Sequence, residues 1–431
     1  MSALPKARNE RLKGACDVQK AIGRPKGLRP SNMLYLHIPF CKQACSYCNF
    51  HFSTSSRGRD ELLLALHQEI RLRKEEIQRA GTETIYLGGG TPSLLTEREL
   101  ADIFRVLAEV SDFDYQSSKV GKEHSKNANG PTDKREITLE ANPDDLTEAT
   151  VEILAASPVN RLSIGLQSFQ EKDLRYMNRA HSAKESTLAM QRVLKAGFTD
   201  LSVDLIYGSP TTSDADWDDN ISRVLDFGVG HVSAYALTVE EKTALAHRIK
   251  TGQLPAPDED RFARQFDRLV ERLTLAGFEH YEISNFAKPG QYSRHNTGYW
   301  QGKPYVGLGP SAHGFNGFDQ RNWNIANNAL YTRLLTGATS IPAGLTETEQ
   351  LSPTDRYNEF VMTGLRTQWG VRRTDLASKF GTSLAEYFST TVREEQLLCY
   401  FDSQKIESEG RYQLNQSGKR LADGIAAALF R

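Results

Sequence analysis

Short apolar runs that alternate with helical patterns restrict the fold of this chain more than any other feature. The β-branched and aromatic residues typical of strands stand between stretches with helical periodicity. A repeated strand–helix order predicts a parallel sheet covered by helices, and therefore the α/β class. The number of repeats fits a partial or full (β/α) barrel, whose chemistry lies at the carboxyl ends of the strands. The runs are residues 33–39, 83–87, 136–141, 161–167, 201–207, 232–237 and 280–286.

The rest of the chain divides around this predicted barrel. We assign residues 33–290 to the barrel, with a polar insertion at 111–135. Residues 1–32 form a basic head without the apolar core of a secretory signal, and we expect disorder there, with an organelle transit peptide as the alternative. Residues 291–350 form a connecting segment, and residues 351–431 predict a small helical domain of winged-helix type. That domain has no clear basic recognition helix, so we expect no nucleic-acid partner.

Composition excludes several classes of protein. The formal net charge of −1 gives no overall field that would attract nucleic acid. No apolar run approaches the roughly 20 residues of a membrane helix, so we expect a cytoplasmic protein that is at most peripheral to a membrane. The chain has five cysteines, and three of them lie within eight residues. An odd number with one tight cluster argues against disulfides and for metal in a reducing compartment.

Cys41, Cys45 and Cys48 form a CxxxCxxC motif directly after the first predicted strand. Three thiolates on one short loop can ligate three irons of a [4Fe–4S] cubane and leave the fourth iron open to another ligand. A structural zinc site is the alternative, but no further cysteine or histidine stands at a zinc spacing. Cys16 and Cys399 lie far away in sequence and are not predicted as ligands.

A glycine run, GGGTP at residues 88–92, follows the second predicted strand. Glycines at a strand end let the backbone approach a ligand without a Cβ collision, although such a run can also be a simple turn. Together with the cysteine motif, this run resembles the radical-SAM family, in which the open iron binds the amino and carboxylate groups of S-adenosylmethionine. The resemblance implies a partial barrel of the radical-SAM type.

Most of the chain, from about residue 34 onward, resembles one branch of that family: the oxygen-independent coproporphyrinogen III oxidases and their relatives. The resemblance rests on residues 35–41, LEANP at 139–143, SIGLQSF at 163–169, NRAHS at 178–182 and VDLIYGSP at 203–210. It implies that two tyrosines lie beside the cofactors, that the glycine run holds the methionine amine, and that polar side chains hold the carboxylate, ribose and sulfonium regions. In that order, the implied residues are Tyr35 and Tyr47; Gly89, Gly90 and Thr91; and Glu140, Gln167, Arg179 and Asp204.

This branch contains enzymes and radical-SAM heme chaperones, and two features favour the chaperones. The oxidases carry a fourth cysteine two residues after the third, where this chain has Phe50. His295 begins HNTGYW at 295–300, which matches the HNxxYW motif of the chaperones, whose histidine is the proposed ligand of the heme iron. The alternative is that His295 only hydrogen-bonds within a loop. His313 is a second, weaker candidate for the iron, and Cys16 stays open as a further heme ligand.

We therefore predict a heme chaperone that binds a [4Fe–4S] cluster, S-adenosylmethionine and heme. It is expected to deliver heme to acceptors that are heme proteins of a respiratory chain. The resemblance also implies a homodimer and acceptors hosted by membranes. Whether S-adenosylmethionine is cleaved, and hence whether the chain is an enzyme, stays open. The alternative functions are coproporphyrinogen III dehydrogenase and a cluster-containing regulator that binds DNA.

Overall fold

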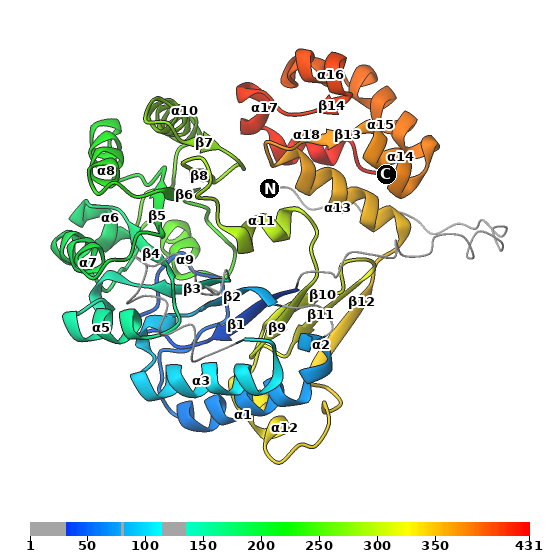
Figure 1. The fold of residues 1–431 in the computed structure, drawn as a ribbon. Coiled ribbons are helices and arrows are strands. Elements are labelled where there is room, and N and C mark those ends of the chain that lie inside the picture. The colour runs from blue at the N-terminus through cyan, green and yellow to red at the C-terminus, as the bar shows by residue number, and fades with distance from the viewer. Residues whose placement is uncertain (1–31, 79–81, 114–134) are drawn as a thin grey trace, which may run out of the picture.

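The computed structural model describes residues 32–78, 82–113 and 135–431 (Figure 1). Within these ranges one 12-stranded sheet has the order β12-β11-β10-β9-β1-β2-β3-β4-β5-β6-β8-β7. Strands β9 and β1 to β6 are parallel, and the strands beyond them on both sides are antiparallel. The strands are β1 (Asn32–Ile38), β2 (Thr82–Gly89), β3 (Glu136–Ala141), β4 (Arg161–Gln167), β5 (Leu201–Tyr207), β6 (His231–Ala236), β7 (Glu279–His280), β8 (Asn285–Ala287), β9 (Tyr305–Leu308), β10 (His313–Phe315), β11 (Gln320–Asn324) and β12 (Thr346–Gln350).

Helices cover the outside of this sheet, so the predicted α/β class is confirmed. In Figure 1, α1, α3, α5 and α7 follow the strands and lie along the outer face. The head and most of the insertion predicted from sequence, with Cys16, lie outside the described residues. The helices of this part are α1 (Arg59–Leu72), α2 (Lys74–Gln78), α3 (Glu97–Val110), α5 (Glu148–Ala156), α6 (Glu171–Tyr176), α7 (Ala183–Lys195), α8 (Asp214–Asp226), α9 (Ala244–Lys250), α10 (Glu259–Leu275), α11 (Arg294–Trp300) and α12 (Asn328–Leu335), with short 3-10 turns at Pro92–Leu94 and Pro143–Asp145.

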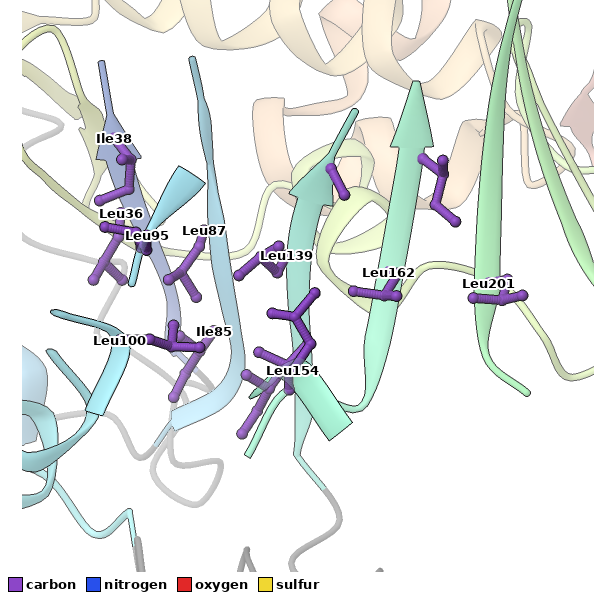
Figure 2. Packing of buried hydrophobic residues seen from close by; sticks show 14 of the residues in the cluster. Leu36, Ile38, Ile85, Leu87, Leu95, Leu100, Leu139, Leu154, Leu162 and Leu201 are labelled. Carbon is purple, nitrogen blue, oxygen red and sulfur yellow. The ribbon is translucent and has the colours of Figure 1, made fainter. Parts of the chain in front are cut away.

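Strands β1 to β6 carry apolar side chains on the outer face and polar side chains on the inner face. In β1, Leu36 and Ile38 are buried in one hydrophobic cluster with the helices. Figure 2 shows this layer across β1 to β5. Because side chains alternate along a strand, Tyr35 and His37 of β1 point the other way. The corresponding inner residues of the next strands are Thr84, Tyr86, Glu136, Glu140, Arg161, Ser163, Asp204 and His231.

The segment 280–286, predicted as one more parallel strand, is instead a short hairpin. Strands β7 and β8 pair with each other, and β8 pairs antiparallel with β6. The reversal comes from a turn in which the Asn285 N–H donates to the Glu282 carbonyl oxygen at 3.2 Å. The Glu282 carboxylate also accepts the Ser284 N–H at 3.1 Å. The single-strand prediction was wrong because a turn stabilised by side chains interrupts the apolar run.

The segment 291–350 adds strands that the sequence did not predict. Strand β9 pairs in parallel with β1, and β10, β11 and β12 continue the sheet. Strands β11 and β12 have the sequences QRNWN and TETEQ, which are too polar to be recognised by their apolar content. This segment therefore belongs to the same sheet as the barrel.

The predicted helical region at the end of the chain has its own hydrophobic core, which contains Tyr357, Phe388 and Leu429. A two-stranded ladder joins β13 to β14, in keeping with the winged-helix prediction. None of the helices in the described ranges is long and apolar enough to span a membrane. The elements are α13 (Pro353–Leu365), β13 (Val371–Arg372), α14 (Arg373–Phe380), α15 (Thr382–Glu394), a 3-10 turn (Leu397–Tyr400), α16 (Ser403–Glu409), β14 (Arg411–Tyr412), α17 (Gln416–Arg420) and α18 (Ala422–Ala428).

A buried ionic network connects α1 to the antiparallel strands. Glu69 is fully buried and accepts from Arg73 at 2.9 Å, from Asn324 at 2.7 Å and from the Tyr331 hydroxyl at 2.6 Å. It also accepts the Gly309 N–H at 2.8 Å. Every lone pair of the carboxylate has a partner, which a buried charge requires.

We expect Arg73→Ala to lower the free energy of unfolding by about 3–5 kcal/mol, because the substitution leaves the Glu69 carboxylate buried without its cation. The matched control is Arg71→Ala, whose ion pair with Glu109 is about half exposed, so its loss should cost about 1 kcal/mol or less. Urea unfolding of the two variants, followed by tryptophan fluorescence, measures the difference. Equal effects of the two substitutions would contradict the importance of this network.

Candidate functional site

The three motif cysteines lie on the loop that follows β1, at the carboxyl end of that strand. The Cys41 N–H donates to the Ser53 carbonyl oxygen at 3.0 Å, and the Ser46 N–H donates to that of Met177 at 2.9 Å. The thiols of Cys41, Cys45 and Cys48 are all half-buried and free. The loop is therefore fixed to the rest of the protein while its sulfurs stay accessible.

Side chains from the end of β2 and from the loop between α6 and α7 contact two of these sulfurs. The Thr91 hydroxyl donates to Cys41 Sγ at 3.5 Å, and Arg179 donates to Cys45 Sγ at 3.2 Å. Asn142 joins the two, since it donates to Thr91 Oγ1 at 3.1 Å and accepts from Arg179 at 2.6 Å. One hydrogen-bonded chain thus runs from Cys41 to Cys45 past the ends of β2 and β3.

This donor set fits an iron–sulfur cluster. Burial is the main reason why the pKa of Cys48 is raised to about 11, and the neighbouring Cys45 and Cys41 add to the rise. Within the described residues, no group of three His, Cys, Asp or Glu side chains is gathered around the position of a single metal ion. A [4Fe–4S] cubane does not require three side chains to converge on one metal position, because each thiolate ligates a different iron.

Arg179, which is predicted to bind the carboxylate of S-adenosylmethionine, also has an N–H group that is available as a hydrogen-bond donor. Its two terminal nitrogens bond to Asn142, Cys45 and the Gly165 carbonyl oxygen. Its buried Nε has no hydrogen-bond partner among the residues that the structure describes. Buried donors in proteins are nearly always paired, so an unpaired N–H beside the cysteine loop fits the carboxylate of a bound ligand.

The glycine motif ends β2 and packs against the chain itself. Gly89 has a φ of 103°, and a Cβ at this position would lie 2.4 Å from the His37 ring. A Cβ on Gly90 would lie 2.6 Å from the Ile38 carbonyl oxygen. The N–H groups of Gly90 and Thr91 donate to the segment that leads into the cysteine loop, at 2.9 and 2.7 Å. These glycines therefore allow β2 to approach that segment closely.

Two carboxylates lie on the inner face next to the glycine motif. Glu140 accepts from the Tyr86 hydroxyl at 2.7 Å and from the Gly89 N–H at 3.0 Å, and the Ser163 hydroxyl donates to Asp204 at 3.3 Å. Burial raises the pKa of Glu140 to about 7 and that of Asp204 to about 6. The charge of Asp204 adds to the rise at Glu140. Carboxyl groups whose pKa values are raised by burial are frequent in binding and catalytic sites.

The remaining predicted contacts of S-adenosylmethionine lie on the same face. Gln167 is the last residue of β4 and has a φ of 63°, a conformation that is strained for a residue other than glycine and frequent at functional sites. The Tyr47 hydroxyl accepts from Arg179 at 3.4 Å, and the Tyr35 hydroxyl is bonded to His37 Nδ1 at 3.1 Å. The structure thus brings the predicted cluster and S-adenosylmethionine residues together along the inner face and carboxyl ends of β1 to β5.

His295 lies apart from this group, near the amino end of β2. It is 1% exposed, and its ring stacks on Tyr86 with 4.9 Å between ring centres. Its Nδ1 bonds to the Thr84 hydroxyl at 2.7 Å and its Nε2 to the Tyr299 hydroxyl at 2.9 Å. Burial lowers the pKa of His295 to about 3. Here the imidazole fixes α11 on the sheet and has no nitrogen free for an iron, so heme ligation by His295 stays a prediction that requires the Tyr299 hydroxyl to move.

A cavity of about 1090 Å³ opens between the sheet, α11 and the C-terminal helices. This volume is slightly above the range of about 300–1,000 Å³ that is typical of small-molecule sites. Tyr299 and Trp300 of the predicted heme motif line it, together with Phe50, whose side chain is 71% exposed. The histidines in its wall are His37, His51 and His313.

Three residues that organise the site were not predicted from the sequence. Asn142 joins the two cysteine partners, and Tyr86 bonds Glu140 and stacks on His295. The buried Glu136 accepts the His295 N–H at 2.9 Å at the start of α11. Asn142 stands in the LEANP motif and Tyr86 alternates with the apolar residues of β2, so both had a sequence signal; Glu136 had none.

Comparison with known proteins agrees with this arrangement. Residues 35–224 match the Radical SAM superfamily, and residues 351–422 match the HemN C-terminal domain. The heme chaperone HemW of Mycobacterium tuberculosis is 34% identical over 412 residues, which cover 95% of this chain and 95% of that protein. The heme chaperone HemW of Bacillus subtilis is 32% identical over 92% of this chain and 98% of that protein.

Among solved structures, the radical-SAM enzyme coproporphyrinogen III oxidase (HemN) of Escherichia coli superposes with a TM-score of 0.76. The match covers 93% of this chain and 90% of that chain at 20% identity, so it shows the fold. Fold and sequence together define a protein of the radical-SAM class. Within that class, the chain belongs to the family whose members include the proteins named heme chaperone HemW.

Glu140 predicts a specific pH dependence of stability. Its pKa in the folded protein, about 7, lies above the ordinary value of 4.5, so the folded protein holds this proton more tightly than the unfolded chain does. The free energy of unfolding should therefore fall as the pH rises from 4.5 to about 7. This loss should be smaller in Glu140→Gln, in which Asp204, with its pKa of about 6, still contributes. Urea unfolding of the cofactor-free protein between pH 5 and 8 measures it, with the exposed Glu148→Gln as the charge control. Parallel pH profiles for Glu140→Gln and the wild type would contradict the raised pKa.

Proposed function

We propose that this protein is a radical-SAM heme chaperone: it binds a [4Fe–4S] cluster, S-adenosylmethionine and heme, and delivers the heme to acceptor proteins. The observation that carries the proposal is the similarity to proteins named heme chaperone HemW, which extends over 95% of the chain and includes both the sheet and the C-terminal region. Homodimer formation, a cytoplasmic location, membrane association and the respiratory nature of the acceptor stay predictions.

The cofactor half of the proposal uses the polar edge of the sheet. Cys41, Cys45 and Cys48 supply three thiolates to the cluster, which, when bound with S-adenosylmethionine, supplies redox chemistry at the open iron. Arg179 has its unpaired Nε for the carboxylate of the ligand. Glu140 offers acceptor oxygens for an ammonium group or a ribose hydroxyl.

Glu140 must be ionised to attract an ammonium group, and its pKa of about 7 makes the attraction depend on pH. The carboxylate is ionised above this value and neutral below it. The affinity for S-adenosylmethionine is therefore expected to rise with pH and to level off above about pH 7.

The heme half of the proposal uses the cavity. Its wall contains an open aromatic surface that includes Phe50, Trp300 and Tyr299. Aromatic side chains bury large apolar area and stack on planar ligands, as a porphyrin requires. Phe50 stands where the oxidases carry a fourth cysteine and is 71% exposed, so a hydrophobic side chain faces solvent without a partner of its own.

We expect Phe50→Ala to weaken heme binding by about 1–2 kcal/mol, or about 5- to 30-fold in Kd, because it removes apolar area that heme would cover. Leu275→Ala is the matched control, since Leu275 is 79% exposed on α10 and does not line the cavity. Titration of the reconstituted protein with hemin, read from the Soret band, measures both. Unchanged affinity in Phe50→Ala would contradict this heme site.

The coproporphyrinogen III dehydrogenase alternative predicts turnover. In one experiment, reduced, anaerobic protein that carries the cluster is incubated with coproporphyrinogen III and S-adenosylmethionine. In a second experiment, the same protein is loaded with heme and mixed with an apo heme protein. The proposal expects no protoporphyrinogen IX and transfer of heme to the acceptor. Formation of protoporphyrinogen IX would contradict the proposed chaperone function and support the dehydrogenase alternative.

A further inference from the structure

The antiparallel part of the sheet turns one polar and aromatic face toward the cavity. His313 and Phe315 lie on the same face of β10, because side chains alternate along a strand. Phe315 is paired with Tyr305 of β9 and with Arg321 of β11, so these two residues share that face. All four residues line the cavity. This wall therefore combines an imidazole, aromatic rings and a cation.

His313 is the cavity histidine whose ring makes no hydrogen bond within the part of the chain that the structure describes. His37 is bonded at both nitrogens, to the Tyr35 hydroxyl at 3.1 Å and to the His51 carbonyl oxygen at 2.8 Å. His51 Nε2 is bonded to Asn328 at 2.7 Å. His313 is exposed, and an imidazole with a free nitrogen is the group that a heme iron takes as an axial ligand.

The turn before β10 holds His313 in a fixed position. Gly309 has a φ of 99° and Ser311 a φ of 63°. The Gly309 N–H donates to the buried Glu69 carboxylate at 2.8 Å, and the Ser311 N–H donates to the Ile325 carbonyl oxygen at 3.1 Å. Strained backbone persists where its surroundings fix it, and a rigid turn of this kind can present an iron ligand in one direction.

The opposite wall, formed by α13 and α14, supplies two cations. The Arg356 guanidinium lies over the Phe318 ring at 3.9 Å from its centre, and the Lys379 ammonium lies over the Phe360 ring at 4.5 Å. Both cations line the cavity, and neither forms an ion pair with a described residue. Arg321, in contrast, is bonded to Glu359 at 2.8 Å. Two cations beside aromatic rings suit a planar ligand that carries two carboxylates.

We propose that His313 is the axial ligand of the heme iron and that Arg356 and Lys379 bind the two propionates. The proposal rests on the heme-binding function proposed above and assigns the ligands within it. The porphyrin then lies between His313 of β10 and the two cations of α13 and α14. His295 is a positioning residue, which fixes α11 and thereby Tyr299 and Trp300 at the edge of the same cavity.

The test is a hemin titration of the full-length, cluster-loaded protein and of the variants His313→Ala and His295→Ala. We expect His313→Ala to raise the Kd for hemin at least 10-fold and to shift the Soret band, with added imidazole restoring the wild-type band. His295→Ala should lower the melting temperature but keep the position of the Soret band. Because His313 is exposed, its substitution should leave the melting temperature unchanged.

Protoporphyrin IX, which has no iron, separates the two kinds of contact. Its affinity should be unchanged in His313→Ala and should fall at least 5-fold in a variant with both Arg356→Gln and Lys379→Gln. If the wild type binds hemin and His313→Ala keeps its affinity and its Soret band, the ligand assignment is overturned and the heme-binding function stands. If the wild type binds no hemin, the proposed function fails and the assignment fails with it.

Discussion

The polar inner face of the parallel strands is the constraint on which the rest of the structure depends. A parallel sheet that is covered on both sides is normally apolar on both faces. Here the helices cover only an apolar outer face, while carboxylates, an arginine, histidines and tyrosines lie on the inner face. Buried polar groups are stable only with partners, and the strands therefore supply partners to one another. The bonds from Tyr86 to Glu140 and from Ser163 to Asp204 are examples.

The inner face has a different role at each end of the strands. Toward the amino ends, Thr84 and Glu136 bind α11 through His295, so that end is closed by the chain itself. Toward the carboxyl ends, Arg179 keeps an N–H that is unpaired within the described part of the chain, and Glu140 has a raised pKa. Both features are expected of a site in which a bound ligand supplies the missing partners of the polar groups. The polar groups with free bonding capacity and the cysteine loop thus lie at the same edge of the sheet.

Much of the fold could be predicted because apolar and polar residues alternate along the strands, according to the face of the sheet on which each side chain lies. Strands β1 to β6 carry apolar residues at every second position, and the cysteine and glycine motifs follow β1 and β2 directly. Strands β11 and β12 gave no such signal, because polar side chains dominate both. The hairpin at Glu282 was hidden since its turn depends on local hydrogen bonds.

The roles of the histidines could not be predicted from sequence for a different physical reason. Whether an imidazole is free to bind iron depends on partners that are distant in the chain. Thr84 lies 211 positions from His295, and nothing local to the HNTGYW motif indicates that it occupies the ring. In the same way, the Glu69 carboxylate fixes the turn before His313 from 240 positions away. A sequence motif therefore identifies the family here, while the packing decides which side chain faces the cavity.

The central claim is that three thiols of one loop hold a [4Fe–4S] cluster whose open iron binds S-adenosylmethionine. Electron paramagnetic resonance of the anaerobically reconstituted, dithionite-reduced protein tests it most directly. The account predicts a [4Fe–4S]⁺ signal that changes shape when S-adenosylmethionine is added and that is absent from the variant in which Cys41, Cys45 and Cys48 are serines. A wild-type spectrum without this signal, or one that S-adenosylmethionine leaves unchanged, would contradict the claim.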